Sequence, residues 1–169
     1  MEISTVVICA VIIVAGLGSL YLYAYFKDKK INNSPLASTD KSLLPQQLQA
    51  YERLVLLADR IALPNLVSRM NQTGGSAKDM QLLLTQTIKQ EFEHNITQQI
   101  YVSTAAWQAI SNLKEQNILV INQVSSFLPQ NATGADLNKG LMQLLVENPK
   151  ASLHTIVSEV LSFEARKIM

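Results

Sequence analysis

The sequence predicts an all-α fold, with a single N-terminal transmembrane helix followed by an irregular bundle of five or six helices. Residues 3–26 form an apolar segment without a charge. Beyond residue 45, apolar side chains recur at three- and four-residue spacing, as on one face of an α-helix. Residues 95–102 break this period. They could form a short strand, but with no second strand to pair with we favour a connector.

Residues 3–26 are expected to cross a lipid bilayer. As a helix they would measure about 36 Å, enough to cross a hydrocarbon core of ~30 Å. A cleavable export signal fits less well, because only Met1 and Glu2 precede the apolar run and no small-residue cleavage site follows it. Residues 1–26 are therefore predicted to be a retained membrane anchor, with the lipid bilayer as the partner of residues 3–26.

The charges after this span predict its orientation. Lys27, Lys29 and Lys30 follow the span, whereas only the amino terminus is basic before it. The positive-inside rule places these lysines in the cytoplasm, with the N-terminus outside. Residues 27–44 are then a polar juxtamembrane linker, and residues 45–169 an α-helical cytoplasmic domain.

One long helix, a short helical piece and a second long helix are expected in the first half of this domain. Pro45 suits the first turn of a helix, and Pro64 ends or kinks that helix because proline cannot donate a backbone hydrogen bond. After a glycine-rich turn, Ser76 and Asp79 have the spacing of a capping box. The apolar residues that set the helical period are Leu48, Tyr51, Leu54, Val55, Ala58, Ile61, Ala62, Leu66, Val67, Met70, Met80, Leu83, Leu84, Ile88 and Phe92.

Three more helices are expected in the second half. Ser103 caps a long helix whose middle, residues 118–121, is apolar on every side. A helix that is apolar all round is surrounded by others or touches a partner, so this is the predicted central helix. Thr133 and Asp136 again have capping-box spacing, and Pro149 is expected to start the final helix. The period is set by Ala106, Trp107, Ile110, Leu113, Ile121, Val124, Leu128, Leu137, Leu141, Leu144, Leu145, Leu153, Ile156, Val157, Val160, Leu161 and Ile168.

Composition argues against several functions. From Pro45 onward ten Lys/Arg balance ten Asp/Glu, and a neutral domain lacks the excess positive charge that binds nucleic acid. The chain has one cysteine, Cys9, so neither an intrachain disulfide nor a Cys-based metal site is predicted. No Walker loop and no Gly-x-Ser-x-Gly elbow occurs.

Side chains with possible chemistry do not form a predicted site. Glu91 and His94 have the Glu-x-x-His spacing of di-iron bundles, but the required second copy is missing, so we interpret them as a solvated charged face. Arg53, Asp59 and Arg60 are assigned no function. The aromatic residues Tyr51, Tyr101, Trp107 and Phe163 could line a pocket, but their spacing favours core positions. We therefore predict no catalytic, cofactor-binding or metal-binding residue and no cofactor.

Three segments carry a resemblance to other proteins: "YERLVLLADRIALPNLVSRM", "IKQEFEHNITQQIYVSTAAWQAISNLKEQ" and "LHTIVSEVLSFEARKIM". With the apolar N-terminus, the chain resembles an uncharacterised family of short bacterial proteins with one N-terminal transmembrane helix and an α-helical cytoplasmic domain. The resemblance covers nearly the whole chain and implies a location in the bacterial inner (cytoplasmic) membrane. It implies no activity and no site residues.

The expected function is that of a membrane-anchored helical binding or scaffold protein without catalytic activity, whose partner is another protein. An alternative is an accessory subunit of a membrane or envelope complex. For that role the small residues Ala15 and Ser19, at small-xxx-small spacing, would let the span pack closely against another helix. The same spacing makes a homo-oligomer possible. An enzyme whose site has no linear motif is the third and least favoured expectation.

Overall fold

The computed structural model describes residues 42–70, 74–147 and 153–169 of the chain. These residues belong to one compact unit, Ser42–Met169, and confirm the all-α class. Six α-helices and one 3₁₀ helix, η1, occur in the described ranges, within the expected five or six helices. They are α2 (Leu44–Ile61), α3 (Leu63–Arg69), α4 (Ala77–His94), η1 (Ile96–Ile100), α5 (Thr104–Phe127), α6 (Gly134–Glu147) and α7 (His154–Ile168).

The predicted membrane span falls outside this description. Residues 3–26 and most of the predicted linker, through residue 41, are not among the described residues. Within the ranges that are described, no helix combines the length and the apolar character needed to cross a membrane.

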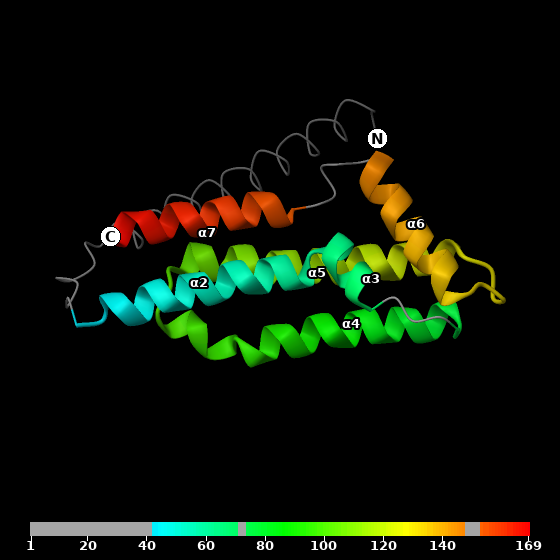
Figure 1. Ribbon diagram of the computed structural model, residues 1–169, viewed down its shortest axis with the longest axis horizontal. Coiled ribbons are helices and arrows are strands. Elements are labelled where there is room, and N and C mark those ends of the chain that lie inside the picture. The colour runs from blue at the N-terminus through cyan, green and yellow to red at the C-terminus, as the bar shows by residue number, and fades with distance from the viewer. Residues whose placement is uncertain (1–41, 71–73, 148–152) are drawn as a thin grey trace, which may run out of the picture. The chain divides into compact units, whose positions relative to one another are not determined.

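Four long helices, α2, α4, α5 and α7, alternate in direction along the chain and form an up-and-down bundle (Figure 1). Helix α7 packs along α2 and also contacts α5, whereas α4 packs along α5 and α2. Helix α6 contacts α3, α4 and α5. Each long helix therefore has at least two helical neighbours, which is what buries the apolar faces expected from the sequence.

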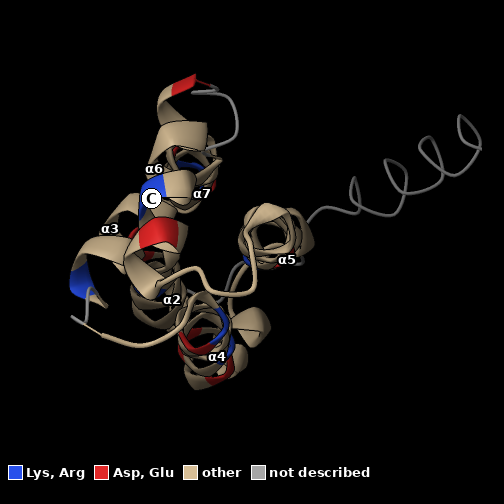
Figure 2. Cartoon of the chain, turned by 90° about the vertical axis from the view of Figure 1, so that its right-hand side faces the viewer, with Lys and Arg blue, Asp and Glu red and all other residues tan. Residues whose placement is uncertain are grey.

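The core is almost entirely aliphatic. Its largest fully buried side chains come from all six α-helices of the described ranges. They are Leu54, Leu57, Ile61, Leu66, Leu84, Ile88, Ile110, Leu113, Ile121, Leu137, Leu141 and Leu161. Charged residues lie outside this core: Figure 2 shows blue and red segments interspersed along α4 rather than gathered as one sign. On α4, therefore, the two signs of charge are mixed rather than separated.

Both predicted capping boxes are present, and they lie side by side. The Ser76 hydroxyl accepts from the Asp79 amide (3.2 Å) while the Asp79 carboxylate accepts from the Ser76 amide (3.1 Å). Thr133 and Asp136 make the equivalent exchange at the start of α6. Ser76 and Thr133 also form an antiparallel β-bridge, so the N-termini of α4 and α6 are joined backbone to backbone.

A glycine allows this close approach. A Cβ at Gly134 would lie 3.2 Å from two carbons of the Met80 side chain, tighter than an ordinary contact. Gly75 precedes the N-cap residue Ser76 and has a φ of 107°, a backbone conformation that residues with a Cβ rarely adopt. Gly75 is thus favoured by its backbone conformation, and Gly134 by the closeness of the Met80 side chain.

Three expectations need correction or completion. Residues 95–102, for which we favoured a connector over a strand, contain the 3₁₀ helix η1. Residues 118–121 of α5 are not enclosed on every side, because Leu119 is 49% exposed, and α2 touches as many helices as α5 does. The final helix begins at His154, while Pro149 lies outside the described residues.

The aromatic residues divide between core and surface. Tyr51 is buried, and its hydroxyl accepts from the Ser103 amide (3.1 Å) at the start of α5. Trp107 is half-buried against Phe92, with ring centroids 5.0 Å apart. Tyr101 and Phe163 are exposed, so the core interpretation is wrong for both of them.

Candidate binding surface

Helix α7 has two apolar faces, of which its own bundle covers one. The inner face contributes the buried Val157 and Leu161. On the outward side Ile156 is 56%, Val160 36% and Phe163 58% exposed. We call these three residues the outer seam. A helix that is apolar on two sides touches a second neighbour or exposes a binding face, so the outer seam is a candidate binding surface.

The spacing of the outer seam gives it a definite geometry. Its residues are separated by four and then three positions, the alternation that places side chains in one line along a helix. Lys167 follows four positions further on. Its ammonium group lies 4.4 Å from the centroid of the Phe163 ring and pairs with Glu164. The seam therefore ends in a cation that partly shields its aromatic residue.

An apolar groove lies between α2 and the end of α7, on the same helix pair. We call it the α2–α7 groove. It encloses about 410 Å³ and is lined mainly by aliphatic side chains, with Glu52 and Arg166 at its edge. Leu56 and Met169, which are 57% and 74% exposed, are among its lining residues. Exposed apolar groups therefore occur both where α7 meets α2 and along the outer seam of α7.

Polar groups at the α2–α3 corner behave differently, because they are paired within the chain. The helix breaks at Ala62, whose ψ of 126° is not helical, and Pro64 follows without a backbone donor. Side chains then donate hydrogen bonds to the last three carbonyls of α2. The donors are Asn65 Nδ2 to Asp59 (3.1 Å), Arg69 Nη2 to Arg60 (3.2 Å) and Asn117 Nδ2 to Ile61 (2.7 Å).

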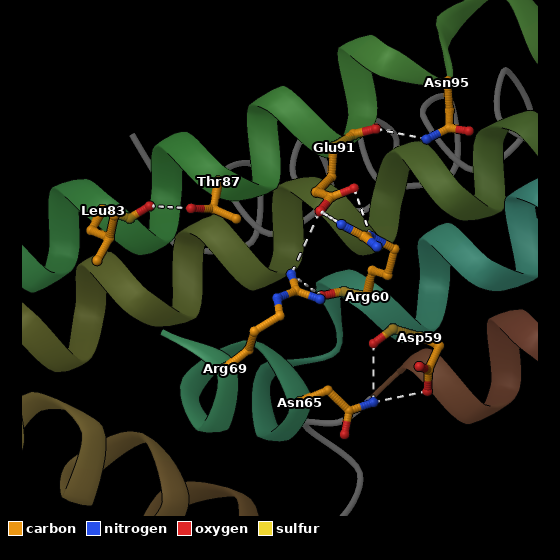
Figure 3. Close-up of polar contacts among 8 residues, drawn as sticks. All are labelled: Asp59, Arg60, Asn65, Arg69, Leu83, Thr87, Glu91 and Asn95. Atoms are coloured by element: carbon orange, nitrogen blue, oxygen red, sulfur yellow. Dashed lines mark hydrogen bonds and ion pairs between the residues drawn. The ribbon is translucent and has the colours of Figure 1, made fainter. Parts of the chain in front are cut away.

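Glu91 of α4 joins this corner to the neighbouring helix (Figure 3). Arg60 donates to it through two nitrogens, with Nε 2.9 Å from Oε2, and Arg69 Nη2 lies 3.6 Å from Oε1. The hydrogen bond and the negative charge of Glu91 raise the pKa of Arg60. This bidentate pair is the strongest polar link between the corner and α4.

This arrangement explains the Glu-x-x-His motif. Glu91 faces the two arginines and its side chain is only 15% exposed, whereas His94 is exposed at the end of α4. Both line an open hollow of about 340 Å³ that also includes Arg53. No group of three potential metal ligands occurs among the described residues. For Glu91 the interpretation as a solvated face is therefore incomplete, since its partners are Arg60 and Arg69.

Sequence reasoning did not single out the outer seam. Ile156 and Val160 entered only as residues of the helical period, and Phe163 as a core aromatic. The signal that could have found the seam was present. Apolar residues in this part of the chain occupy two sets of helical positions, one that begins at Leu153, just before α7, and one that begins at Ile156. One face of a helix cannot hold both sets.

The fold and this surface define a small all-α bundle with an uncovered apolar helix face. The chain belongs to a family described as "Family of unknown function (DUF7935)", whose family model matches residues 1–168. The match covers the segments that carried the resemblance noted from the sequence, except for the final residue, Met169. Neither the curated proteins nor the solved structures include a significant match to the chain.

Proposed function

We propose that this chain is a membrane-anchored helical binding protein. In this proposal residues 3–26 span the bacterial inner membrane with the N-terminus outside, residues 27–44 are the linker, and residues 45–169 form the cytoplasmic binding domain. The apolar, uncharged span and the lysines that follow it support the anchor and its orientation. The partner is another protein molecule, either a different protein or a second copy of this chain.

The observation that carries the proposal is the outer seam. Burying three aliphatic or aromatic side chains that are 36–58% exposed would remove substantial apolar surface from water. A helix face of this kind is a common binding mode, in which residues spaced by three and four positions insert into a partner. The neutral charge balance of the domain also fits a protein partner better than nucleic acid.

Position supports a role for the α2–α7 groove as well. Leu48, in the second turn of α2, lines the groove, and the predicted linker ends at the start of α2. The groove therefore begins close to the point where the predicted linker joins the helical domain. A tether of this kind raises the effective concentration of the domain toward partners in the same membrane.

Co-purification from mild detergent tests the binding function. We expect the full chain to retain a partner protein and Phe163→Asp to lose most of it, because the aspartate would place a charge in the interface. Leu82→Asp is the matched control: Leu82, on α4, is 56% exposed and lies outside the seam. Equal recovery from the wild type and Phe163→Asp would contradict the proposed surface.

Topology and the role of the span need separate experiments. Protease added outside intact cells should leave the helical domain undigested, and digestion there would overturn the proposed orientation. Replacing residues 3–26 by an unrelated span distinguishes the two membrane roles. A tethered binding domain would keep its function, whereas an accessory subunit that packs through Ala15 and Ser19 would lose it.

A further inference from the structure

We propose that the outer seam of α7 pairs with the α7 of a second copy of this chain, and that the two helices run antiparallel. The inference rests on the binding surface proposed above and identifies its partner. The alternation of four and three positions in Ile156, Val160 and Phe163 is the spacing of a two-stranded coiled coil. Such a seam fits a helix of the same geometry, and α7 itself supplies one.

Two charges flank the outer seam on one side. Glu159 immediately precedes Val160, and Arg166 immediately precedes Lys167, so the two residues are two helical turns apart on the same flank. Both are exposed. In an antiparallel pair of identical helices, the flank that carries Glu159 and Arg166 in one copy lies beside the same flank of the other copy. Glu159 of each copy then faces Arg166 of the other, and the two-fold symmetry makes this pair twice.

The parallel arrangement is disfavoured by the same residues. In a parallel pair this flank would meet the opposite flank of the second helix, where Glu164 lies five positions after Glu159. Two carboxylates would then face each other across the interface. Like charges at such positions select against an arrangement, so the charge pattern of α7 favours the antiparallel pair.

The apolar layers are consistent with this register. In an antiparallel pair centred between Val160 and Phe163, Val160 of each copy packs against Phe163 of the other copy. At each end the aliphatic stem of Lys167 covers Ile156 while its ammonium group reaches water. The opposite flank of α7 is occupied, because Val157 is buried and the Glu164 side chain is 18% exposed. The seam therefore accepts one additional helix.

Two central layers form a short interface, and free in solution such a pair would be weak. The proposed anchor changes this, because two copies confined to one membrane have a raised effective concentration. A reversible dimer, whose population depends on the density of the protein in the membrane, is the expected behaviour.

Charge reversal in the full chain tests the inference. Donor- and acceptor-labelled populations are reconstituted in lipid vesicles, and energy transfer is followed as lipid dilutes the protein. Glu159→Arg should weaken self-association by about tenfold, since both symmetry-related pairs become repulsive. The double variant Glu159→Arg/Arg166→Glu should restore it. Glu93→Arg, an exposed reversal on α4, is the control and should leave it unchanged.

Each outcome has a defined meaning. Stronger association of Glu159→Arg would show a parallel pair and overturn the proposed orientation. Unchanged association of both Glu159→Arg and Phe163→Asp would overturn self-pairing. If Phe163→Asp nevertheless loses a different protein in co-purification, the proposed function stands without self-pairing. If Phe163→Asp changes neither measurement, the outer seam is not the binding surface and both proposals fail.

Discussion

The α2–α3 corner and the outer seam of α7 differ in whether their groups have partners within the chain. At the corner, the last three carbonyls of α2 each accept a hydrogen bond from a side chain within the chain. Along α7, three large apolar side chains remain exposed although the helix has a well-buried second face. The corner completes its interactions internally, whereas the seam leaves its apolar side chains exposed. The first arrangement contributes to stability, and the second is available for binding.

The largest expected effect on stability is a difference between substitutions on the two faces of α7. Leu161, on the inner face, is fully buried, so Leu161→Ala should lower the free energy of unfolding by about 2–5 kcal/mol through lost burial and the cavity left behind. Phe163→Ala, two residues away on the outer seam, should change it by about 0.5 kcal/mol or less. Denaturant unfolding followed by circular dichroism measures both. Similar losses for the two variants would show that the seam is already covered.

A buried amide tests the corner. Asn117 is 2% exposed and donates to the Ile61 carbonyl at 2.7 Å. Asn117→Ala leaves that carbonyl without this donor inside the bundle, and we expect a loss of about 1–3 kcal/mol. Asn112 lies on the same helix but is exposed, so Asn112→Ala should be near neutral. An equal effect of the two substitutions would mean that the corner does not depend on this hydrogen bond.

The ion pairs of the corner should contribute less than the amide. Because Arg60 is 54% exposed at its side chain, solvent screens the pair, and Glu91→Gln should cost about 1 kcal/mol or less. The distinguishing measurement is salt dependence: rising ionic strength should weaken the wild type and leave Glu91→Gln nearly unaffected. Equal salt dependence of both proteins would exclude a contribution from the cluster.

The smallest effect concerns pH and the two capping boxes. Hydrogen bonds from Ser76 lower the pKa of Asp79, and hydrogen bonds from Thr133 lower that of Asp136. A lowered pKa in the folded state means that this stability is present above the ordinary value of 3.8 and is lost as pH falls through the folded value. Thermal unfolding from about pH 5 to pH 2 should therefore be flatter for Asp79→Asn/Asp136→Asn.

Local features of the fold were predictable because their causes are local. Ser76, Ser103 and Thr133 cap helices where spacing indicated caps, and Pro64 coincides with the break between α2 and α3. Each depends on residues within one turn of the chain. The apolar period likewise identified the helices that build the core.

The remaining features depend on residues that are distant in sequence. Glu91 meets Arg60 across 31 positions, and no spacing rule pairs two residues at that separation. Exposure of Phe163 follows from which face of α7 the other helices cover, so periodicity alone could not separate it from Leu161. The 3₁₀ helix over Ile96–Ile100 was missed because it has neither a strand period nor an α-helical one.

The bridge between the starts of α4 and α6 also affects how the domain opens. The Ala77 amide donates to the Ala132 carbonyl at 2.9 Å, and the Gly134 amide donates to Gly75 at 3.0 Å. These bonds close a loop that contains α4, η1 and α5, and they tie the start of α4 to the start of α6. Exchange of these two amides with deuterium would therefore report concerted opening of the segment as one unit, separately from fraying at the ends of α2 and α7.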